Sequence, residues 1–173
     1  MNIIALSSVD GYENQLRELL QDCVGSGASV GFIAPIAQAE ANSYWQDVQG
    51  ELANGTRKLW VAIENGMVVG AVQLGLCSKA NGSHRGEVEK LMVHTSARGK
   101  GISKKLMASL EEVAVSLELL LLVLDTRLGD IASTLYRQLG YIEAGQIPDF
   151  ARSSDGQLDA TVLFYKQING MKR

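Results

Sequence analysis

The sequence predicts an α+β fold with the three-layer character of α/β proteins, in which helices flank a mixed, mainly antiparallel sheet of six to seven strands. Apolar residues switch between helical and strand spacing along the chain, in the order β-α-α-β-β-β-α-β-α-β-β. Asn65-Gly66 stands between two apolar runs, which is the strongest short signal for an antiparallel hairpin. One helical segment lies between two strands in the middle of the chain, which indicates a βαβ unit.

The first half of the chain is predicted to contain a strand, two helices and a hairpin. Leu16, Leu19 and Val24 recur at helical spacing, and the tripeptide "GSG" after them ends that helix. A second helical segment ends at Asn54, and two strands follow, joined by the Asn-Gly turn. The predicted elements are a strand over 3–9, helices over 12–24 and about 36–54, and two strands within 58–76.

The second half is predicted to contain the βαβ unit, a short helix and two closing strands. Ile102, Leu106, Leu110 and Val113 form an apolar stripe of helical period. The run "ELLLLVLDT" lacks alternation, which is typical of a strand buried on both faces. A short helix is stopped by Gly140. The predicted elements are strands over 87–93, 118–126, 141–147 and 160–166 and helices over 101–117 and 130–139.

Composition limits the class of protein. The 173 residues, 46% of them hydrophobic, suffice for one globular domain, so a single domain over 1–173 is expected. A net charge of -3 lacks the basic balance of a nucleic-acid-binding protein, and the longest apolar run is far too short to cross a bilayer. Cys23 and Cys77 have neither disulfide-framework nor metal-site spacing. We therefore expect a cytoplasmic protein with no nucleic-acid partner, no membrane contact and no metal.

The stretch "SARGKGISKKLM", residues 96–107, joins a strand to a helix and has the character of an anion site. A helix N-terminus exposes unpaired backbone N–H groups and the positive end of the helix dipole. Gly99 and Gly101 let the backbone approach an anion, while Arg98 and Lys100 add positive charge. The GxxxxGK[ST] spacing is absent, and the dinucleotide fingerprint lacks its third glycine. The stretch is either a pyrophosphate site of another kind or an ordinary basic turn.

Two motifs give the chain a resemblance to a known family. Arg98, Gly101 and Ser103 match the three fixed positions of Q/R-x-x-G-x-G/A, the acyl-CoA motif of the GNAT superfamily of N-acetyltransferases, with serine in place of Gly or Ala. The segment "ASTLYRQLGY", residues 132–141, resembles the superfamily's A-x-x-x-Y-x-x-x-G-F/Y segment. The predicted element order is similar over nearly the whole chain. Stretches such as "EVEKLMV" resemble, more narrowly, the tabtoxin-resistance type of acetyltransferase.

The resemblance implies a V-shaped opening around the pantetheine arm of acetyl-CoA. The opening would lie between the strand 87–93 and the strand over 120–125, which splay apart in this family. Backbone groups near the end of the first strand would pair with pantetheine, and the amides of the following loop would hold the pyrophosphate. The residues implied are Met92 and Val93 for pantetheine, and Arg98, Gly99, Lys100, Gly101, Ile102 and Ser103 for pyrophosphate.

Acetyl transfer to an amine requires a group that removes the ammonium proton, usually a carboxylate acting directly or through water. We interpret Glu87 as this base or water-positioning residue, with Asp125 as its counterpart at the end of the opposite strand. Strand alternation puts Glu87 and Glu89 on one face and Lys90 on the other, unless a bulge breaks the phase. The alternative interpretation is that these acids are solvated charges at strand ends.

Tyr136 falls at the tyrosine of the family motif. The resemblance implies that its hydroxyl donates a proton to the departing sulfur or holds the thiolate by a hydrogen bond. A helix tyrosine just before Gly140 is alternatively a core residue. A strand amide such as that of Val93 is the expected oxyanion donor, and transfer is expected to be direct, in a ternary complex.

The resemblance implies a small amine as acceptor, with an amino-acid-like, antibiotic, toxin or metabolite structure. In this fold the acceptor wall is expected from the segment 25–36, Tyr44, Trp45 and the loop 147–160, and Phe32 or Trp45 could line a pocket. Two alternatives stay open, a protein lysine or N-terminal acetyltransferase and a non-catalytic acyl-CoA-binding sensor domain. We expect a monomer or a homodimer, and the strand 160–166 could pair across a dimer.

Overall fold

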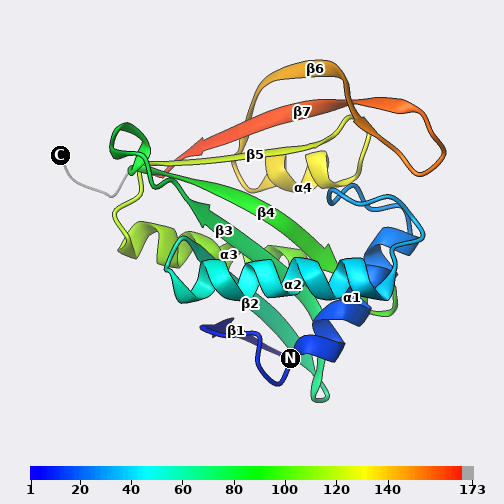
Figure 1. Cartoon of the computed structure of the whole chain (residues 1–173). Coiled ribbons are helices and arrows are strands. Elements are labelled where there is room, and N and C mark those ends of the chain that lie inside the picture. The colour runs from blue at the N-terminus through cyan, green and yellow to red at the C-terminus, as the bar shows by residue number, and fades with distance from the viewer. Residues whose placement is uncertain (169–173) are drawn as a thin grey trace.

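The computed structural model describes residues 1–168 and confirms the predicted fold class and element order (Figure 1). Within these residues a sheet of seven strands is flanked by four α-helices. The strands are β1 (Asn2–Leu6), β2 (Arg57–Glu64), β3 (Met67–Leu76), β4 (Arg85–Val93), β5 (Leu121–Arg127), β6 (Ile142–Arg152) and β7 (Leu158–Gln167). The helices are α1 (Glu13–Gly25), α2 (Gln38–Ala53), α3 (Ile102–Ser116) and α4 (Ala132–Gln138).

The strands lie in the order β1-β2-β3-β4-β5-β7-β6. Neighbouring strands are antiparallel except β4 and β5, which are parallel and are connected through α3. Asn65 and Gly66 both have positive φ, 52° and 78°, as a type I′ turn requires, and they close the β2–β3 hairpin. Strand β7 is paired on both edges, so the prediction that the strand 160–166 could pair across a dimer is wrong. The edge strand on that side is β6.

Each face of the sheet carries its own core. Helix α3 packs on one face, where Leu106 and Leu110 are fully buried. Helices α1 and α2 cover the other face, where Leu16, Leu19 and Trp45 are buried. Figure 1 shows α1 and α2 on the near side of the sheet and α3 on the far side. Strands β2 to β4 are therefore covered on both faces, which fixes β4 as one wall of the site described below.

Strands β4 and β5 separate along their length. Among the described residues they pair only over 85–87 and 121–123. Beyond these positions β4 stays paired with β3 as far as Val93, while β5 stays paired with β7 as far as Arg127. Figure 1 shows the two strands diverging toward the side where the α1–α2 loop lies. The splayed pair of central parallel strands that the resemblance implied is present.

A β-bulge interrupts β4 in the splayed region. Gln73 of β3 pairs with Glu89, and Ala71 pairs with Met92, so two residues of β4 oppose one residue of β3. Lys90, the first of these two, has a left-handed φ of 52°, which is unusual for a residue other than glycine. The bulge shifts the phase of side-chain alternation in the second half of the strand.

The shift of phase moves a lysine to the cleft side. Val88 packs in the core under α3, whereas Met92, four residues later, packs in the core under α1 and α2. The ammonium of Lys90 lies 5.9 Å from the ring centre of Phe32 and 5.7 Å from that of Tyr44, on the α1–α2 side. Lys90 therefore shares a side with the glutamates of β4, and the prediction from strict alternation, which put it on the other face, is wrong.

Strand β6 is longer than predicted. It runs to Arg152 rather than ending at residue 147, and β7 begins at Leu158. The expected acceptor-wall loop over 147–160 is therefore wrong, since only 153–157 connect the two strands. Pro148 is compatible with the extension because β6 lies at the edge of the sheet, where a missing backbone N–H costs no ladder hydrogen bond.

Candidate active site

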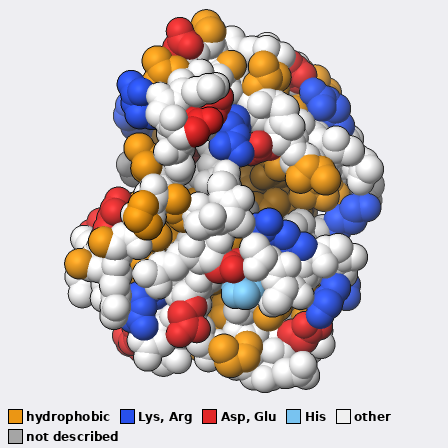
Figure 2. All heavy atoms as spheres, turned by 90° about the vertical axis from the view of Figure 1, so that its right-hand side faces the viewer, with side chains coloured by type: hydrophobic (Ala, Val, Ile, Leu, Met, Phe, Trp, Pro, Cys, Tyr) orange, Lys and Arg blue, Asp and Glu red, His pale blue; other side chains and the backbone are white. Residues whose placement is uncertain are grey.

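A cleft of about 540 Å³ opens where β4 and β5 separate. Figure 2 shows this face of the molecule, hollowed near its middle, with hydrophobic side chains in its depth and Lys or Arg side chains beside the opening. The walls come from the α1–α2 loop, β4, β5, α4 and the β6–β7 hairpin. Four predicted site residues line it, namely Glu87, Arg98, Asp125 and Tyr136.

Glu87 and Asp125 lie on opposite walls of the cleft, Glu87 on β4 and Asp125 on β5. Thr161 of β7 donates a hydrogen bond of 2.9 Å from Oγ1 to Asp125 Oδ2. Glu87 is an exposed residue on the cleft wall, and the partial burial of its carboxyl raises its pKa above the ordinary value. The negative charges of Glu89 and Asp125 add to the shift. A carboxylate with a raised pKa is the stronger proton acceptor, which is what a general base needs.

Tyr136 reaches the cleft from α4 and is only 6% exposed. Its ring lies edge-on to Tyr141, with centres 5.8 Å apart, and tilted against Phe164 at 6.0 Å. Burial raises the pKa of the Tyr136 hydroxyl, and the charge of Asp125 adds to the effect. The phenol therefore stays protonated at neutral pH and is able to donate its proton or a hydrogen bond. Tyr136 is a core residue that also lines the cleft.

The loop from β4 into α3 turns with two left-handed glycines. Gly99 has φ 80° and Gly101 has φ 74°, and Gly101 is the N-cap residue of α3. No side chain caps the helix at this residue, so the first amides of α3 are left for an anion or solvent. A Cβ at either glycine would meet open space. The backbone conformation, and not crowding, is what requires glycine here.

Arg98 ties this loop to two neighbouring elements. Its Nε donates to the backbone oxygen of Val93 over 3.2 Å, and its Nη2 donates to Ser26 Oγ over 2.9 Å. The thiol of Cys23 also donates to the Val93 oxygen, at 3.5 Å. A pantetheine arm that pairs with the end of β4 would share the Val93 carbonyl with these donors.

The side chains of the other predicted cofactor-binding residues lie in different surroundings. Lys100 points away from the cleft, because its Nζ forms an ion pair of 2.8 Å with Glu64 at the end of β2. The side chains of Met92 and Ile102 are buried in the two cores, each 2% exposed. Ser103 lies in the first turn of α3. Any contact of Met92 or Ile102 with a cofactor would therefore use backbone groups, as the sequence analysis expected.

Arg127 is a cleft residue that the sequence analysis missed. Its guanidinium forms an ion pair of 2.9 Å with Asp130, and its Nη1 donates to Ser153 Oγ over 3.3 Å. Its Nη2 also donates to the backbone oxygen of Gly27, 3.0 Å away in the α1–α2 loop. The signal was present, since Arg127 follows Asp125 by two positions on a strand and therefore shares its face.

Lys90 is the second cleft residue that sequence reasoning did not place. Its ammonium lies beside Gly31, where a Cβ would come within 3.3 Å of Nζ, and over the rings of Phe32 and Tyr44. Burial lowers the pKa of the Lys90 ammonium, although Glu89 and Asp125 oppose the shift. Its position depends on the β-bulge, which arises from pairing with β3 and leaves no local signal in the sequence.

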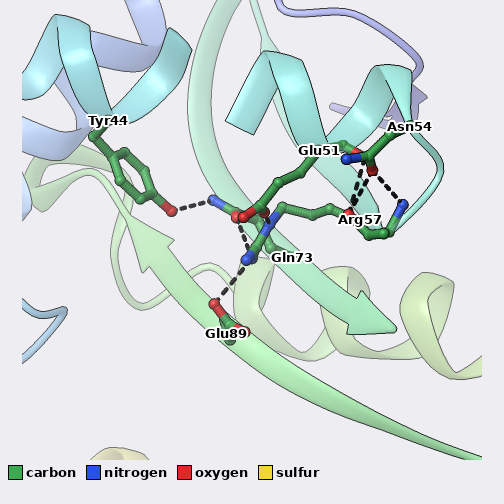
Figure 3. A network of polar contacts seen from close by, with 7 residues as sticks. Tyr44, Glu51, Asn54, Arg57, Gln73 and Glu89 are labelled. Carbon is green, nitrogen blue, oxygen red and sulfur yellow. Dashed lines mark hydrogen bonds and ion pairs between the residues drawn. The ribbon is translucent and has the colours of Figure 1, made fainter. Parts of the chain in front are cut away.

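A polar network lies next to the cleft on the α2 side (Figure 3). Arg57 forms ion pairs with Glu51 and, at 2.9 Å, with Glu89, and it donates to Gln73 Oε1 over 2.8 Å. Gln73 in turn donates from Nε2 to the hydroxyl of Tyr44 over 2.8 Å. The network joins α2, β2, β3 and β4 and holds Glu89, the acidic neighbour of Glu87, as a paired carboxylate.

The segments expected to form the acceptor wall differ in where their side chains lie. A second hollow of about 650 Å³ lies between the α1–α2 loop and the β6–β7 hairpin, and Phe32 lines it. The amide of Ala34 donates to Ser154 Oγ over 2.9 Å, which ties the loop to the hairpin. Trp45 is 2% exposed in the core under α1 and α2, so the prediction that it could line a pocket is wrong.

Two further properties concern residues 1–168 alone. No group of three or more His, Cys, Asp and Glu side chains in this range is arranged to hold a metal ion. No helix in the same range is both long enough and apolar enough to cross a membrane.

Comparison with solved structures places the fold among acetyltransferases. A ribosomal-protein-alanine N-acetyltransferase from Brucella melitensis is 23% identical with a TM-score of 0.80, and the match covers 97% of this chain and 100% of that one. A putative acetyltransferase from Salmonella typhimurium, solved with its cofactor acetyl-CoA, is 19% identical with a TM-score of 0.78, covering 100% and 98%. A phosphinothricin acetyltransferase from Sinorhizobium meliloti, solved with acetyl-CoA, is 19% identical with a TM-score of 0.79, covering 97% and 89%.

The family assignment rests on a separate comparison. The model of the acetyltransferase (GNAT) family matches residues 14–141, from α1 to the residue before β6. The matched range includes the splayed strands β4 and β5, the glycine loop that begins α3, and Tyr136. With the family's segment order and the splayed β4–β5 pair both present, the chain belongs to the GNAT family of acetyltransferases.

Proposed function

We propose that this protein transfers the acetyl group of acetyl-CoA to a primary amine of a small molecule, by direct attack in a ternary complex. One observation carries the proposal: Glu87, Asp125 and Tyr136 line a single cleft between the splayed strands. The cleft also reaches Arg98, at the loop that begins α3. An acid on each wall, a protonated phenol and an anion site are the groups that acetyl transfer to an amine needs.

The residues around the cleft fit acetyl-CoA. The amides from Arg98 to Ser103 would hold the pyrophosphate at the start of α3, and the backbone of Met92 and Val93 would pair with the pantetheine arm. When bound, acetyl-CoA supplies the activated acetyl group as a thioester. The structure offers an unpaired β4 edge for the arm, because the ladder with β5 ends at residue 87.

The proposed roles follow from the environment of each side chain. Glu87, with its raised pKa, takes the proton from the acceptor ammonium, directly or through water, and Asp125 on the opposite wall helps to attract the cation. Tyr136, which stays protonated, donates to the departing sulfur. The amide of Val93 is the proposed donor to the oxygen on which negative charge develops.

A tethered loop favours a small acceptor over a protein. Hydrogen bonds join Gly27 to Arg127 and Ala34 to Ser154, so the α1–α2 loop is fixed against the far wall of the cleft. This arrangement narrows the acceptor side, where a protein chain would need an open groove. The proposed acceptor is amino-acid-like, as the resemblance to tabtoxin-resistance enzymes implies. The alternative is a protein N-terminus or lysine, and one fold neighbour is named for a ribosomal-protein alanine.

A thiol-release screen tests the proposal. The purified protein is mixed with acetyl-CoA and either small amines (amino acids, amino sugars, polyamines) or peptides with free N-termini and lysines. We expect CoA release with at least one small amine and none with peptides, and we expect Glu87→Gln to lose most of it. Glu112→Gln, an exposed acid on α3, is the matched control and should keep full activity. CoA release with peptides alone would show that the acceptor is a protein and would contradict the small-molecule assignment.

A further inference from the structure

Three cationic side chains line the cleft, and two of them are already engaged. Arg98 donates to Val93 and Ser26, and Arg127 is paired with Asp130 and bonded to two further groups. Lys90 differs, because within residues 1–168 its ammonium forms no ion pair or hydrogen bond, although it lies near the rings of Phe32 and Tyr44 and feels the charges of the cleft acids. Lys90 is therefore the cationic residue of this cleft lining that neither an ion pair nor a hydrogen bond holds in place.

The backbone is distorted to put this amine there. Lys90 has a left-handed φ of 52°, which is unfavourable for a residue other than glycine. Without the bulge its side chain would alternate onto the face covered by α3, with Val88. Bulges next to active sites commonly re-aim a side chain. Lys90 thus extends into the acceptor side of the cleft from a position two residues before Met92, beside the β4 edge proposed for the pantetheine arm.

We propose that Lys90 is itself an acetyl acceptor, so that the protein acetylates its own cleft lysine from bound acetyl-CoA. This inference rests on the proposed function. In the step, the lone pair of neutral Nζ forms a bond to the thioester carbonyl carbon, and the carbon–sulfur bond breaks. Nζ gives one proton to a carboxylate such as Glu87 or to water, and the sulfur gains one from Tyr136 or water, leaving an amide and the free CoA thiol.

The surroundings favour this reaction at Lys90 over surface lysines. Only the unprotonated amine attacks a thioester, and burial lowers the pKa of Lys90, which increases the neutral fraction. A held amine and a held thioester also react as one molecule, which removes the entropic cost of their encounter. Acetylation would abolish the charge of Lys90 and extend its side chain into the acceptor side, so the modified protein would lose acceptor turnover.

The test is site-resolved acetylation of the intact protein. The purified protein is incubated with isotopically labelled acetyl-CoA without any acceptor, and peptides are quantified over time by mass spectrometry. We expect label at Lys90 to appear at least about tenfold faster than at Lys105, an exposed lysine on α3 that reports background chemistry. Excess CoA should suppress the Lys90 signal and leave the Lys105 signal unchanged. Tyr136→Phe should slow labelling at Lys90 alone.

The outcomes separate this inference from the proposed function. Calorimetry on the same sample measures whether acetyl-CoA binds. If it binds and Lys90 is labelled no faster than Lys105, the self-acetylation inference is overturned while the proposed function stands. If acetyl-CoA does not bind, both the self-acetylation inference and the proposed function are overturned. Fast labelling of Lys90 that CoA does not suppress would show a merely reactive lysine and would also overturn the inference.

Discussion

Arg127 on β5 and Gly27 in the α1–α2 loop are joined by a hydrogen bond of 3.0 Å from Nη2 to the backbone oxygen, across 100 positions of sequence. The same guanidinium pairs with Asp130 and reaches Ser153. One side chain thus connects three walls of the cleft. Because Gly27 belongs to the proposed acceptor wall, this contact relates the splayed strand directly to acceptor binding.

Replacing Arg127 by methionine should loosen the α1–α2 loop without disturbing the glycine loop that begins α3. We expect faster amide hydrogen exchange over residues 26–31 and an acceptor KM about tenfold higher, since one charge-assisted hydrogen bond is worth about 1.5–3 kcal/mol. Binding of acetyl-CoA should change little. Arg137→Met is the control, because Arg137 pairs with Glu143 at the surface, away from the cleft lining. Unchanged exchange and KM in Arg127→Met would show that the loop does not depend on this contact.

Tyr136→Phe should lower kcat while the affinity for acetyl-CoA stays close to that of the parent protein. A positioned proton donor is worth about 10²–10⁴-fold, and the phenyl ring keeps the packing against Phe164. Steady-state kinetics with calorimetric binding separates the two effects. Tyr141→Phe removes a hydroxyl from the neighbouring buried ring and serves as the comparison. Equal activity of both variants would reduce Tyr136 to a packing role.

The pH profile should report Glu87. A base works only when ionised, so kcat/KM should fall as the pH drops through the pKa of Glu87, which lies above the ordinary carboxyl value. Glu87→Gln should flatten this acidic limb and lower the rate. Arg57→Met should move the limb to higher pH, because the positive charge of Arg57 favours ionised Glu87. If the acidic limb is identical in the parent protein and in both variants, a group other than Glu87 accepts the ammonium proton.

Gly101→Glu should abolish acetyl-CoA binding, since it puts a carboxylate at the anion site and strains a backbone with φ 74°. Gly55→Glu is a matched control. Gly55 has φ 79° and open space around a Cβ, as Gly101 does, but it lies before β2 and outside the cleft lining. Both variants should lose similar stability in urea, whereas only the first should lose binding. Retained binding in Gly101→Glu would remove the pyrophosphate assignment.

Arg57→Met should lower the free energy of unfolding by about 2–4 kcal/mol, because it leaves Glu89 and Gln73 without their shared donor. Adding Glu89→Gln should restore part of this loss, since the unpaired charge is then gone. Urea unfolding measures both, with Lys105→Met on the exposed face of α3 as a reference. A single variant within about 0.5 kcal/mol of the parent would show that the network of Figure 3 contributes little.

Local sequence patterns predicted the helices and strands. Most of the features that were not predicted depend on contacts between residues far apart in the sequence. The helical stripe in α3 and the Asn65-Gly66 turn are set by neighbours in sequence, and both were found. The bulge at Lys90 depends on register with β3, and the partners of Arg127 lie in distant loops, so neither is visible in a short window. Strand β6 extends beyond residue 147 through Pro148, which an edge strand tolerates, and its place at the edge of the sheet is not visible in the local sequence.

Family motifs predicted Arg98 and Tyr136, and the chemical need for a base predicted Glu87 and Asp125. Arg98, Glu87, Asp125 and Tyr136 do line one cleft, whereas Lys100 is paired elsewhere and Trp45 is core. Their roles in binding and catalysis stay predictions. The α1–α2 loop and the β6–β7 hairpin, which line the side proposed for the acceptor, are far apart in sequence and meet only on folding. The shape of that side could therefore not be derived from spacing.

Calorimetric titration of acetyl-CoA into the purified protein, with CoA, ATP and NAD as comparison ligands, tests most directly whether the cleft between β4 and β5 is an acetyl-CoA site. We predict micromolar binding of acetyl-CoA at one site per chain, competition by CoA, and no response to ATP or NAD. Absence of binding, or an equal response to ATP, would contradict the assignment and would leave the loop before α3 as an ordinary basic turn.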